Sequence, residues 1–339
     1  MHAAVSTVTV TIPQAISRHL HATQFNHGVG LRPLFAGAAL GLFAAVIVRR
    51  LRRPPVGVVV KLGGSCATHK SEFEIANFTV ITETAAQLAR RPSTAGDAVL
   101  LHGAGSFGHF QAHKHGTSRG LAGGGWLGFC DTRGSVTLLN NHVVRALVAA
   151  GVPAVGLPPF PATRLRRRKL QDFPPLLTPV AEALNRGLVP VLHGDAVYDD
   201  DQGCAIVSGD ALMVRLCDAL QPDLCVFLTD VAGVYDRPPS EAGAALLPEL
   251  RVGRGGALRV AARGGAGAGA EAAEIATSTA AHDVTGGLAA KLTAAAAIAA
   301  RGIPVVIAQT GTEHAAAALA GERPEVGTVV MREGAGWPV

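Results

Sequence analysis

The sequence has no closely spaced cysteine pair. Its five cysteines are scattered over 339 residues and none forms a Cys-X-X-Cys pair: they are Cys66, Cys130, Cys204, Cys217 and Cys225. This spacing argues against a structural zinc site and a disulfide framework, and it favours a reducing compartment. Because 48% of the residues are hydrophobic, the chain can bury a sizeable core without covalent cross-links.

Acidic residues are missing from the start of the chain, where the first one is Glu72. The first 60 residues contain six arginines but no lysine, a composition typical of a targeting sequence. Six of the 30 basic residues lie there, so the remainder carries 24 basic and 25 acidic residues. This near-neutral remainder has no excess of positive charge for nucleic acid, and we expect no nucleic-acid partner.

The apolar run 33–48, "PLFAGAALGLFAAVIV", has 16 residues and precedes "RRLRR". It falls short of the roughly 20 residues of a full membrane span. Three interpretations stay open: a plastid or mitochondrial transit peptide that is cleaved, a membrane anchor with cytoplasmic arginines, and an unstructured leader. All three place residues 1–55 outside the fold. We expect a cytoplasmic catalytic domain that the leader can anchor to a membrane, and the alternative is a plastid or mitochondrial location after the leader is cleaved.

Beyond the leader, apolar runs alternate with segments of helical spacing. Runs such as 56–62 and 224–230 predict buried strands, and 209–220 predicts a helix. The alternation predicts an α/β fold, a three-layer α/β/α sandwich with a mainly parallel central sheet. Two stretches interrupt the pattern: the basic, proline-flanked 158–175, which we expect to be irregular, and the Gly/Ala/Arg-rich 253–274, which we expect to be a flexible insertion.

A glycine turn follows the first predicted strand in "KLGGSCATHK". Lys61 ends the strand, and Gly63 and Gly64 let backbone N–H groups approach an anion closely, with Lys70 following. Such turns at the carboxyl ends of parallel strands bind phosphates. The alternative is a tight turn with two solvated lysines.

A second glycine turn, "HGAGSFGHFQAHKHG" (102–116), contains GxGxxG and four histidines but no Walker lysine. A dinucleotide fold is disfavoured because the turn follows the second strand and no strand ending in an acid comes about 20 residues later. A zinc site is disfavoured because no acid stands between His109 and His113. We expect His113 and His115 to be exposed, and His109 to lie at the turn itself, at a helix entrance.

Three more polar turns follow predicted strands. Asp210 begins a helix in "VSGDAL", where it either faces a site or only caps the helix. The other two turns are "FLTDVAGVYDRPP", with Thr229, Asp230, Gly233 and Tyr235, and "HDVTGGLAAK", with Gly286, Gly287 and Lys291. Five polar or glycine-rich turns at strand ends are hard to explain as five independent coincidences.

These motifs resemble the amino-acid kinase fold family and, within it, the plant-type isopentenyl phosphate kinases. The resemblance covers about residues 56–332 and rests on "VKLGGS", "HGAGSFGHFQA", "VPVLHGDAVYDDDQGCAIVSGD", "VFLTDVAGVYDRPPSE" and "AHDVTGGLAAK". It implies ATP- and Mg²⁺-dependent phosphorylation of isopentenyl phosphate to isopentenyl diphosphate by a homodimer. It also implies one kinase domain, 56–339, with an acceptor-phosphate half at about 56–200 and a nucleotide half at about 201–339.

The resemblance also implies roles for single residues. The catalytic set is Lys61, Lys70, His109, Asp210 and Lys291, with His109 on the acceptor phosphate and Asp210 ordering the lysines. The ATP-binding set is Lys61, Leu62, Gly63, Gly64, Ser65, Gly105, Thr229, Asp230, Gly233, Tyr235, Gly286, Gly287 and Lys291. The substrate-binding set is Ala104, Gly105, His109 and Gly209, and no residue is implied as a metal ligand.

The prenyl tail of isopentenyl or dimethylallyl phosphate needs an apolar lining. Phe107, Phe110, Val136 and Leu139 are candidates, with ordinary core packing as their alternative role. The segment 161–176 departs from the family pattern and is expected to border this pocket, which puts the preferred tail length in doubt. Two other functions stay open: another phosphate or phosphonate kinase of this fold, such as a fosfomycin kinase, and a nucleotide-binding regulatory protein. The complete catalytic set argues against the regulatory protein.

Overall fold

The computed structural model describes residues 56–92, 96–171, 173–261 and 287–338. By its internal contacts the chain separates into Met1–Arg52 and Arg53–Val339, and the described residues belong to the second unit. The leader, with its apolar run 33–48, lies outside them. Among the described helices, none has the length and hydropathy needed to span a membrane.

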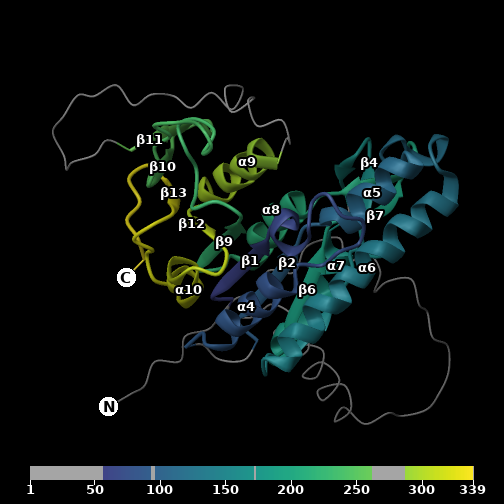
Figure 1. Ribbon diagram of the computed structural model, residues 1–339, viewed down its shortest axis with the longest axis horizontal. Coiled ribbons are helices and arrows are strands. Elements are labelled where there is room, and N and C mark those ends of the chain that lie inside the picture. Colours follow the sequence, from purple (N-terminus) through teal and green to yellow (C-terminus); the bar gives the residue numbers. More distant parts are fainter. Residues whose placement is uncertain (1–55, 93–95, 172, 262–286, 339) are drawn as a thin grey trace, which may run out of the picture. The chain divides into compact units, whose positions relative to one another are not determined.

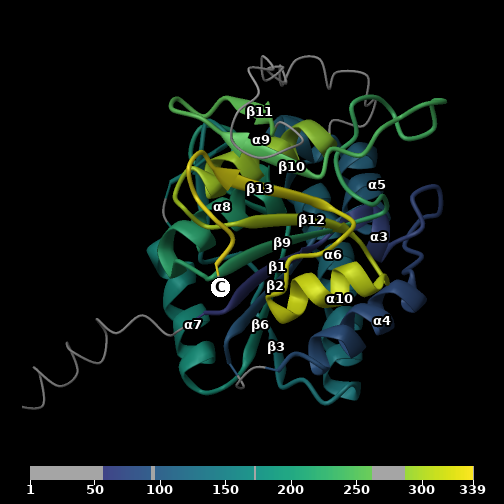
Figure 2. The same ribbon diagram turned by 90° about the vertical axis from the view of Figure 1, so that its left-hand side faces the viewer.

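A nine-stranded sheet forms the centre of the unit, in the order β11-β10-β13-β12-β9-β1-β2-β6-β3 (Figures 1 and 2). Neighbouring central strands run parallel, and the described antiparallel pairs are β12 with β13 and β10 with β11. The predicted mainly parallel sheet is therefore confirmed. The strand bounds are β1 Val58–Leu62, β2 Ala98–His102, β3 Ala154–Gly156, β6 Val189–His193, β9 Leu224–Thr229, β10 Glu249–Val252, β11 Leu258–Val260, β12 Val305–Gln309 and β13 Thr328–Arg332.

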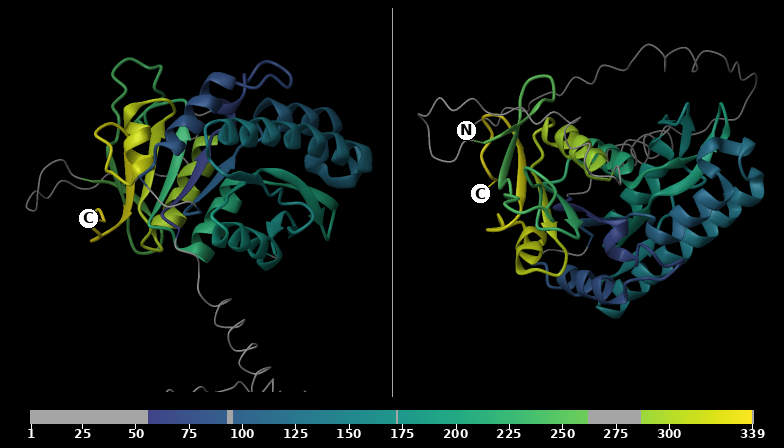
Figure 3. Two further views of the ribbon diagram at one scale, coloured as in Figure 1. Left: turned by 90° about the horizontal axis from the view of Figure 1, so that it is seen from below. Right: turned by 45° about the horizontal axis from the view of Figure 1, so that its top comes forward.

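Helices cover both faces of this sheet, as Figure 3 shows. One face carries α3 (Gly64–Ala67), α4 (Phe78–Ala89), α5 (Gly105–His115), α6 (Gly125–Ala149) and α10 (Glu313–Ala320), with the 3₁₀ turn η1 (Thr117–Ala122) between α5 and α6. The other face carries α7 (Pro174–Asn185), α8 (Gly209–Leu220) and α9 (Gly287–Ala299). Side chains of β1 alternate between two cores, because Val58 and Val60 face the first group and Val59 the second. The predicted α/β/α sandwich is confirmed.

The stretch 158–175, expected to be irregular, instead contributes a hairpin to a second sheet. This sheet has the order β5-β4-β7-β8, with β4 Arg164–Arg166, β5 Lys169–Leu170, β7 Asp195–Asp199 and β8 Gly203–Val207. Arg167 and Arg168 form the hairpin turn with φ of 49° and 61°. Their N–H groups donate to the carboxylates of Asp201 and Asp199, both at 2.8 Å. Because these acids come more than 30 residues later, the local pattern does not reveal the hairpin.

Some element boundaries also differ from those predicted. α8 begins and ends at the predicted 209 and 220, but α6 begins at Gly125 rather than 134, and α4 begins at Phe78 rather than 72. Asn77 caps α4 by accepting from the Val80 N–H at 3.3 Å, which fixes the later start. The predicted insertion 253–274 contains β11, which pairs with β10, and its residues from 262 onward lie outside the described residues.

Candidate active site

The carboxyl ends of four neighbouring strands meet at one edge of the large sheet. Leu62 of β1 is in register with His102 of β2, and His102 with His193 of β6. On the other side, Leu62 is in register with Leu228 of β9. The polar turns that follow these strands therefore lie side by side, which is the place where open α/β sheets bind ligands.

The two glycine loops touch each other through their backbones. A Cβ atom on Gly103 would lie 2.5 Å from the Gly64 nitrogen, and one on Gly64 would lie 2.6 Å from the Gly105 nitrogen. No side chain fits between them, so glycine is required at both contacts. The predicted donor loop and acceptor loop are thus immediate neighbours, as the transfer of a group between two phosphates requires.

Thr68, which the sequence analysis did not single out, links these two loops. Its hydroxyl donates to the Gly64 carbonyl at 2.9 Å and accepts from the Ser106 N–H at 2.9 Å. The side chain is 2% exposed, so both bonds form away from water. Thr68 holds the start of α5 against the turn after β1.

Lys61 reaches the site from the end of β1 and is 7% exposed. Its Nζ atom forms an ion pair with Asp210 Oδ1 in the first turn of α8. Ser208 caps this helix by accepting from the Ala211 N–H at 3.1 Å, so the interpretation of Asp210 as the cap is wrong. A Cβ atom on Gly209 would lie 3.1 Å from Lys61 Cε, which indicates that glycine leaves room for the lysine stem.

Two more lysines surround this pair. Lys70 Nζ lies 3.0 Å from Asp230 Oδ2, and both side chains are largely exposed. Although burial opposes ionisation, the hydrogen bond and charge of Lys70 lower the pKa of Asp230. Burial and the like charge of Lys61 lower the pKa of Lys291 in α9, against the attraction of Asp210 and Asp230. Three lysines and two carboxylates leave an excess of positive charge, which favours an anionic ligand.

His109 lies in the second turn of α5 and is exposed. The helix starts at Gly105, which has a φ of 52° and abuts Thr68, while Ala104 precedes it. His113 is exposed as predicted. The prediction of exposure is wrong for His115, whose side chain is only 17% exposed and whose Nε2 atom lies 2.9 Å from Asp131 Oδ2 of α6.

The remaining predicted ATP-binding residues are spread more widely. Leu62 is fully buried with its side chain in the core, so it offers only backbone to a ligand, whereas Ser65 in α3 is half-buried. Thr229 is buried and donates to the Val231 carbonyl at 2.7 Å. Gly233 abuts Thr328, and Tyr235 forms a bridge with Leu246. Gly287 is the first residue of α9, and Gly286 lies outside the described residues.

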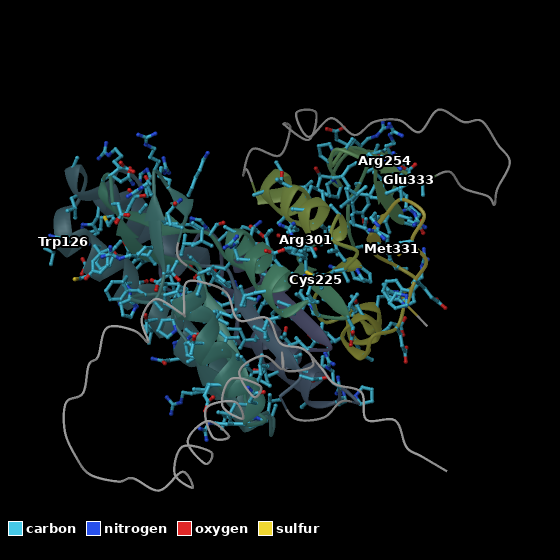
Figure 4. All side chains as sticks on the ribbon, turned by 180° about the vertical axis from the view of Figure 1, so that it is seen from behind. Trp126, Cys225, Arg254, Arg301, Met331 and Glu333 are labelled. Atoms are coloured by element: carbon cyan, nitrogen blue, oxygen red, sulfur yellow. The ribbon has the colours of Figure 1, made fainter. Side chains whose placement is uncertain are left out.

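The predicted lining of the prenyl tail is mostly core. Phe107, Val136 and Leu139 are at most 1% exposed, whereas Phe110 is 39% exposed and meets the Phe73 ring at 6.0 Å. A separate groove of ≈ 920 Å³ opens between α6 and the small sheet. Figure 4 labels Trp126, which lines this groove, on the opposite side of the view from Met331 and Glu333. Its lining is Trp126, Phe129, Cys130, Arg133, Gly134, Thr137, Leu138, Asn141, Phe160 and Tyr198.

Known proteins are similar to this chain in sequence and in fold. Residues 57–309 match the profile of the amino acid kinase family. The isopentenyl phosphate kinase of Arabidopsis thaliana is 38% identical over 313 residues, which cover 80% of this chain and 92% of that protein. The chain belongs to the amino acid kinase family, in its isopentenyl phosphate kinase branch.

Another isopentenyl phosphate kinase and a solved structure are also similar to this chain. The isopentenyl phosphate kinase of Methanothermobacter thermautotrophicus is 33% identical over 193 residues, covering 54% of this chain and 71% of that protein. A crystal structure of an isopentenyl phosphate kinase superposes with a TM-score of 0.64 at 27% identity, covering 80% of this chain and 99% of the other. The family fold predicted from the motifs is therefore confirmed.

Lys291→Ala is expected to weaken ATP binding more than it slows phosphoryl transfer. The lowered pKa of Lys291 reflects a buried cation, which a polyphosphate would stabilise with a charge-assisted hydrogen bond worth roughly 1.5–3 kcal/mol. We expect the KM for ATP to rise about tenfold or more, with a single-turnover rate at saturating ATP that changes less than about threefold. Thr293→Ala, at an exposed position of the same helix, is the control. An equal loss in the single-turnover rate would contradict this role.

Proposed function

We propose that this protein transfers the γ-phosphoryl group of ATP to isopentenyl phosphate and forms isopentenyl diphosphate. The backbone contact between Gly64 and Gly103 is the observation that carries the proposal. It puts the backbone of the proposed donor-phosphate loop directly against the backbone of the proposed acceptor-phosphate loop. The isopentenyl phosphate kinase of Arabidopsis thaliana, similar over most of this chain, supports the substrate.

The reaction needs little covalent help from the protein. A phosphate oxygen of the acceptor attacks the γ-phosphorus, the bond from that phosphorus to the β-phosphate bridging oxygen breaks, and ADP leaves with those electrons. The acceptor is already an anion, so no general base is required. The obstacle is the charge of two polyanions, and positioned cations lower it most. Lys61, Lys70 and Lys291 supply this charge, and His109 is proposed to donate to the acceptor phosphate.

We propose Mg²⁺-ATP as the donor substrate, with the metal held mainly by the phosphates. Asp210 and Asp230 are the carboxylates of the site, and each is paired with a lysine. No group of three described His, Cys, Asp or Glu residues is placed to hold a metal. Magnesium commonly binds through substrate phosphates and water with one or two carboxylates, so Asp230, the more exposed of the two, is the residue that would contact it.

The acceptor pocket is proposed to favour short tails. A five-carbon tail buries modest apolar area, about 0.8 kcal/mol per CH₂, so discrimination among short alkyl phosphates is expected to be moderate. Dimethylallyl phosphate should be used, butyl-type phosphates should be used less well, and long prenyl phosphates poorly.

One assay tests the proposed activity. ADP release is measured with isopentenyl phosphate, dimethylallyl phosphate, butyl phosphate and fosfomycin, each with and without Mg²⁺. We expect Mg²⁺-dependent turnover that is fastest with the two prenyl phosphates. Faster turnover of fosfomycin would instead assign a phosphonate kinase, and ATP binding with no turnover of any acceptor would assign a regulatory protein.

We propose that the leader determines location, with a cytoplasmic kinase region if it anchors the chain and an organellar one if it is cleaved. Carbonate-washed membranes should retain the full chain through residues 33–48 and release a truncated protein that begins at Val56. The truncated protein should be fully active, because β1 and all later site elements are intact. A full-length, uncleaved chain in the supernatant would refute the anchor.

We also propose a homodimer that uses the outer side of α6. This 25-residue helix exposes Leu127, Leu138 and Val148, and Gly134 among them is small enough for a close helix approach. Light scattering should give twice the mass of one chain, and Leu138→Lys should shift the protein towards the monomer.

A further inference from the structure

Two histidines lie buried directly beneath the acceptor loop. His102 ends β2 and His193 ends β6, and the two are partners across the parallel pair. Both are 0% exposed, and their rings stack with centroids 5.4 Å apart and an interplanar angle of 27°. Burying a polar ring costs free energy unless its hydrogen bonds are made, so this pair of rings at the base of the site requires a physical reason.

Each ring makes the same local hydrogen bond. His102 Nδ1 lies 3.0 Å from the Gly103 carbonyl oxygen, and His193 Nδ1 lies 3.0 Å from the Gly194 carbonyl oxygen. A carbonyl can only accept, so each Nδ1 carries the proton. Burial and the neighbouring His193 lower the pKa of His102 to about 3, and burial lowers the pKa of His193 to about 4. Both rings are therefore neutral Nδ1–H tautomers near pH 7.

This bond fixes the direction of the next backbone N–H. In a trans peptide the C=O and the following N–H point to opposite sides. With the Gly103 carbonyl turned down to the His102 ring, the Ala104 N–H points away from the core, towards the edge where the two glycine loops meet. Among the described residues, the Ala104 and Gly105 N–H groups have no hydrogen-bond acceptor, so they are free to bind an anion.

His193 extends the same support to the catalytic lysine. Gly194, whose carbonyl the His193 ring holds, donates its N–H to the His102 carbonyl at 3.2 Å. A Cβ atom on Gly194 would lie 3.3 Å from the nitrogen of Gly209, the residue before Asp210. The stacked rings thus connect the acceptor loop after β2 with the start of α8, where Asp210 pairs with Lys61.

We propose that His102 and His193 are positioning residues, whose Nδ1–H groups hold the Gly103 and Gly194 carbonyls towards the core and thereby aim the Ala104 N–H at the acceptor phosphate. This inference rests on the proposed function, since it assigns the acceptor loop to isopentenyl phosphate. The other nitrogen of His102, Nε2, lies 3.1 Å from Asn140 Oδ1 in α6. Without a proton Nε2 can only accept, so Asn140 holds the ring plane when its amide turns the NH₂ group to this nitrogen.

The two amide side chains separate positioning from packing. Asparagine places its NH₂ group where histidine has Nδ1, whereas glutamine places it where histidine has Nε2. His102→Asn therefore keeps the donor to Gly103, and His102→Gln loses it while keeping a contact with Asn140. We expect the KM for isopentenyl phosphate to rise about tenfold or more in His102→Gln and less than about threefold in His102→Asn. The KM for ATP should stay unchanged in both.

The Asn and Gln variants of His193 test the hydrogen bond to the Gly194 carbonyl in the same way. They keep the proposal testable if a His102 variant fails to fold. His193→Gln should lower kcat more than His193→Asn, because α8 carries Asp210. His142→Gln is the control, since this half-buried histidine of α6 packs on Phe78 and Phe107. Equal KM values for the Asn and Gln variants at His102, with a wild-type enzyme that turns over isopentenyl phosphate, would overturn the positioning role alone. A wild-type enzyme without this turnover would refute the proposed function instead.

Discussion

Lys61→Ala is expected to lower the rate of phosphoryl transfer by about 10²–10³-fold, the effect of removing one preorganised group that stabilises transition-state charge. The lysine is buried and fixed by Asp210, so its charge is in place before the reaction begins. ATP binding should weaken less than the transfer rate falls. Single-turnover experiments at saturating ATP, together with calorimetric ATP binding, separate the two effects.

Lys70→Ala gives the comparison with Lys61 at a more exposed lysine of the same site. The Lys70 side chain is 61% exposed and pairs with the exposed Asp230, and ion pairs of this kind are worth about 0–1 kcal/mol. We expect Lys70→Ala to lower the rate of phosphoryl transfer by about tenfold at most. Thermal unfolding of each variant checks the fold, because Lys61→Ala leaves Asp210 without its partner. Identical losses at Lys61 and Lys70, or unchanged transfer with weak ATP binding at Lys61, would contradict the assigned role.

His109→Ala is expected to lower kcat/KM for isopentenyl phosphate by about 10²-fold, since it removes a donor to the acceptor phosphate. His109 projects from the second turn of α5, the helix that begins at the acceptor loop. His109→Asn and His109→Gln keep an N–H donor, so they should lose about tenfold. The dissociation constant for ATP should remain that of the wild-type protein in all three variants.

His113→Ala controls for the loss of a histidine from the same helix. His113 is one turn further along α5 and is exposed, so its replacement should leave kcat/KM unchanged. Near-wild-type rates in the three His109 variants would remove this residue from the site. A loss in His113→Ala as large as that in His109→Ala would indicate a general effect on α5.

The central strands could be predicted because their sequences are short runs of residues that are nearly all apolar. In β1 every residue from Val58 to Leu62 is buried, as parallel strands covered on both faces require. α5 gave no such signal, since Gly105 and Gly108 interrupt it and it has hardly any apolar side. Thr68 accepts from the Ser106 N–H in the first turn of this helix. A tertiary contact therefore contributes to the place where α5 begins.

The motifs predicted which residues belong to the site, but they did not predict how the lysines and carboxylates pair. Lys61 and Asp210 are 149 residues apart, and nothing local to either residue indicates the other. The motif resemblance placed both in one catalytic set, and their roles stay predictions. His102 and His193 were missed, although the sequence carries a signal for them: both "LLHG" and "VLHG" place a histidine and a glycine after an apolar run. A repeated strand end of this kind indicates equivalent backbone geometry.

The position of β9 in the sheet has a consequence for synthesis on the ribosome. β9 lies between β1 and β12, yet it is synthesised some 160 residues after β1. The same separation, 160 residues, divides Lys70 from Asp230, the residue that follows β9. At about 5–20 residues per second, β1 waits roughly 10–30 s with one edge unpaired. Unpaired apolar strand edges invite aggregation, so the nascent chain is expected to need a chaperone until β9 emerges.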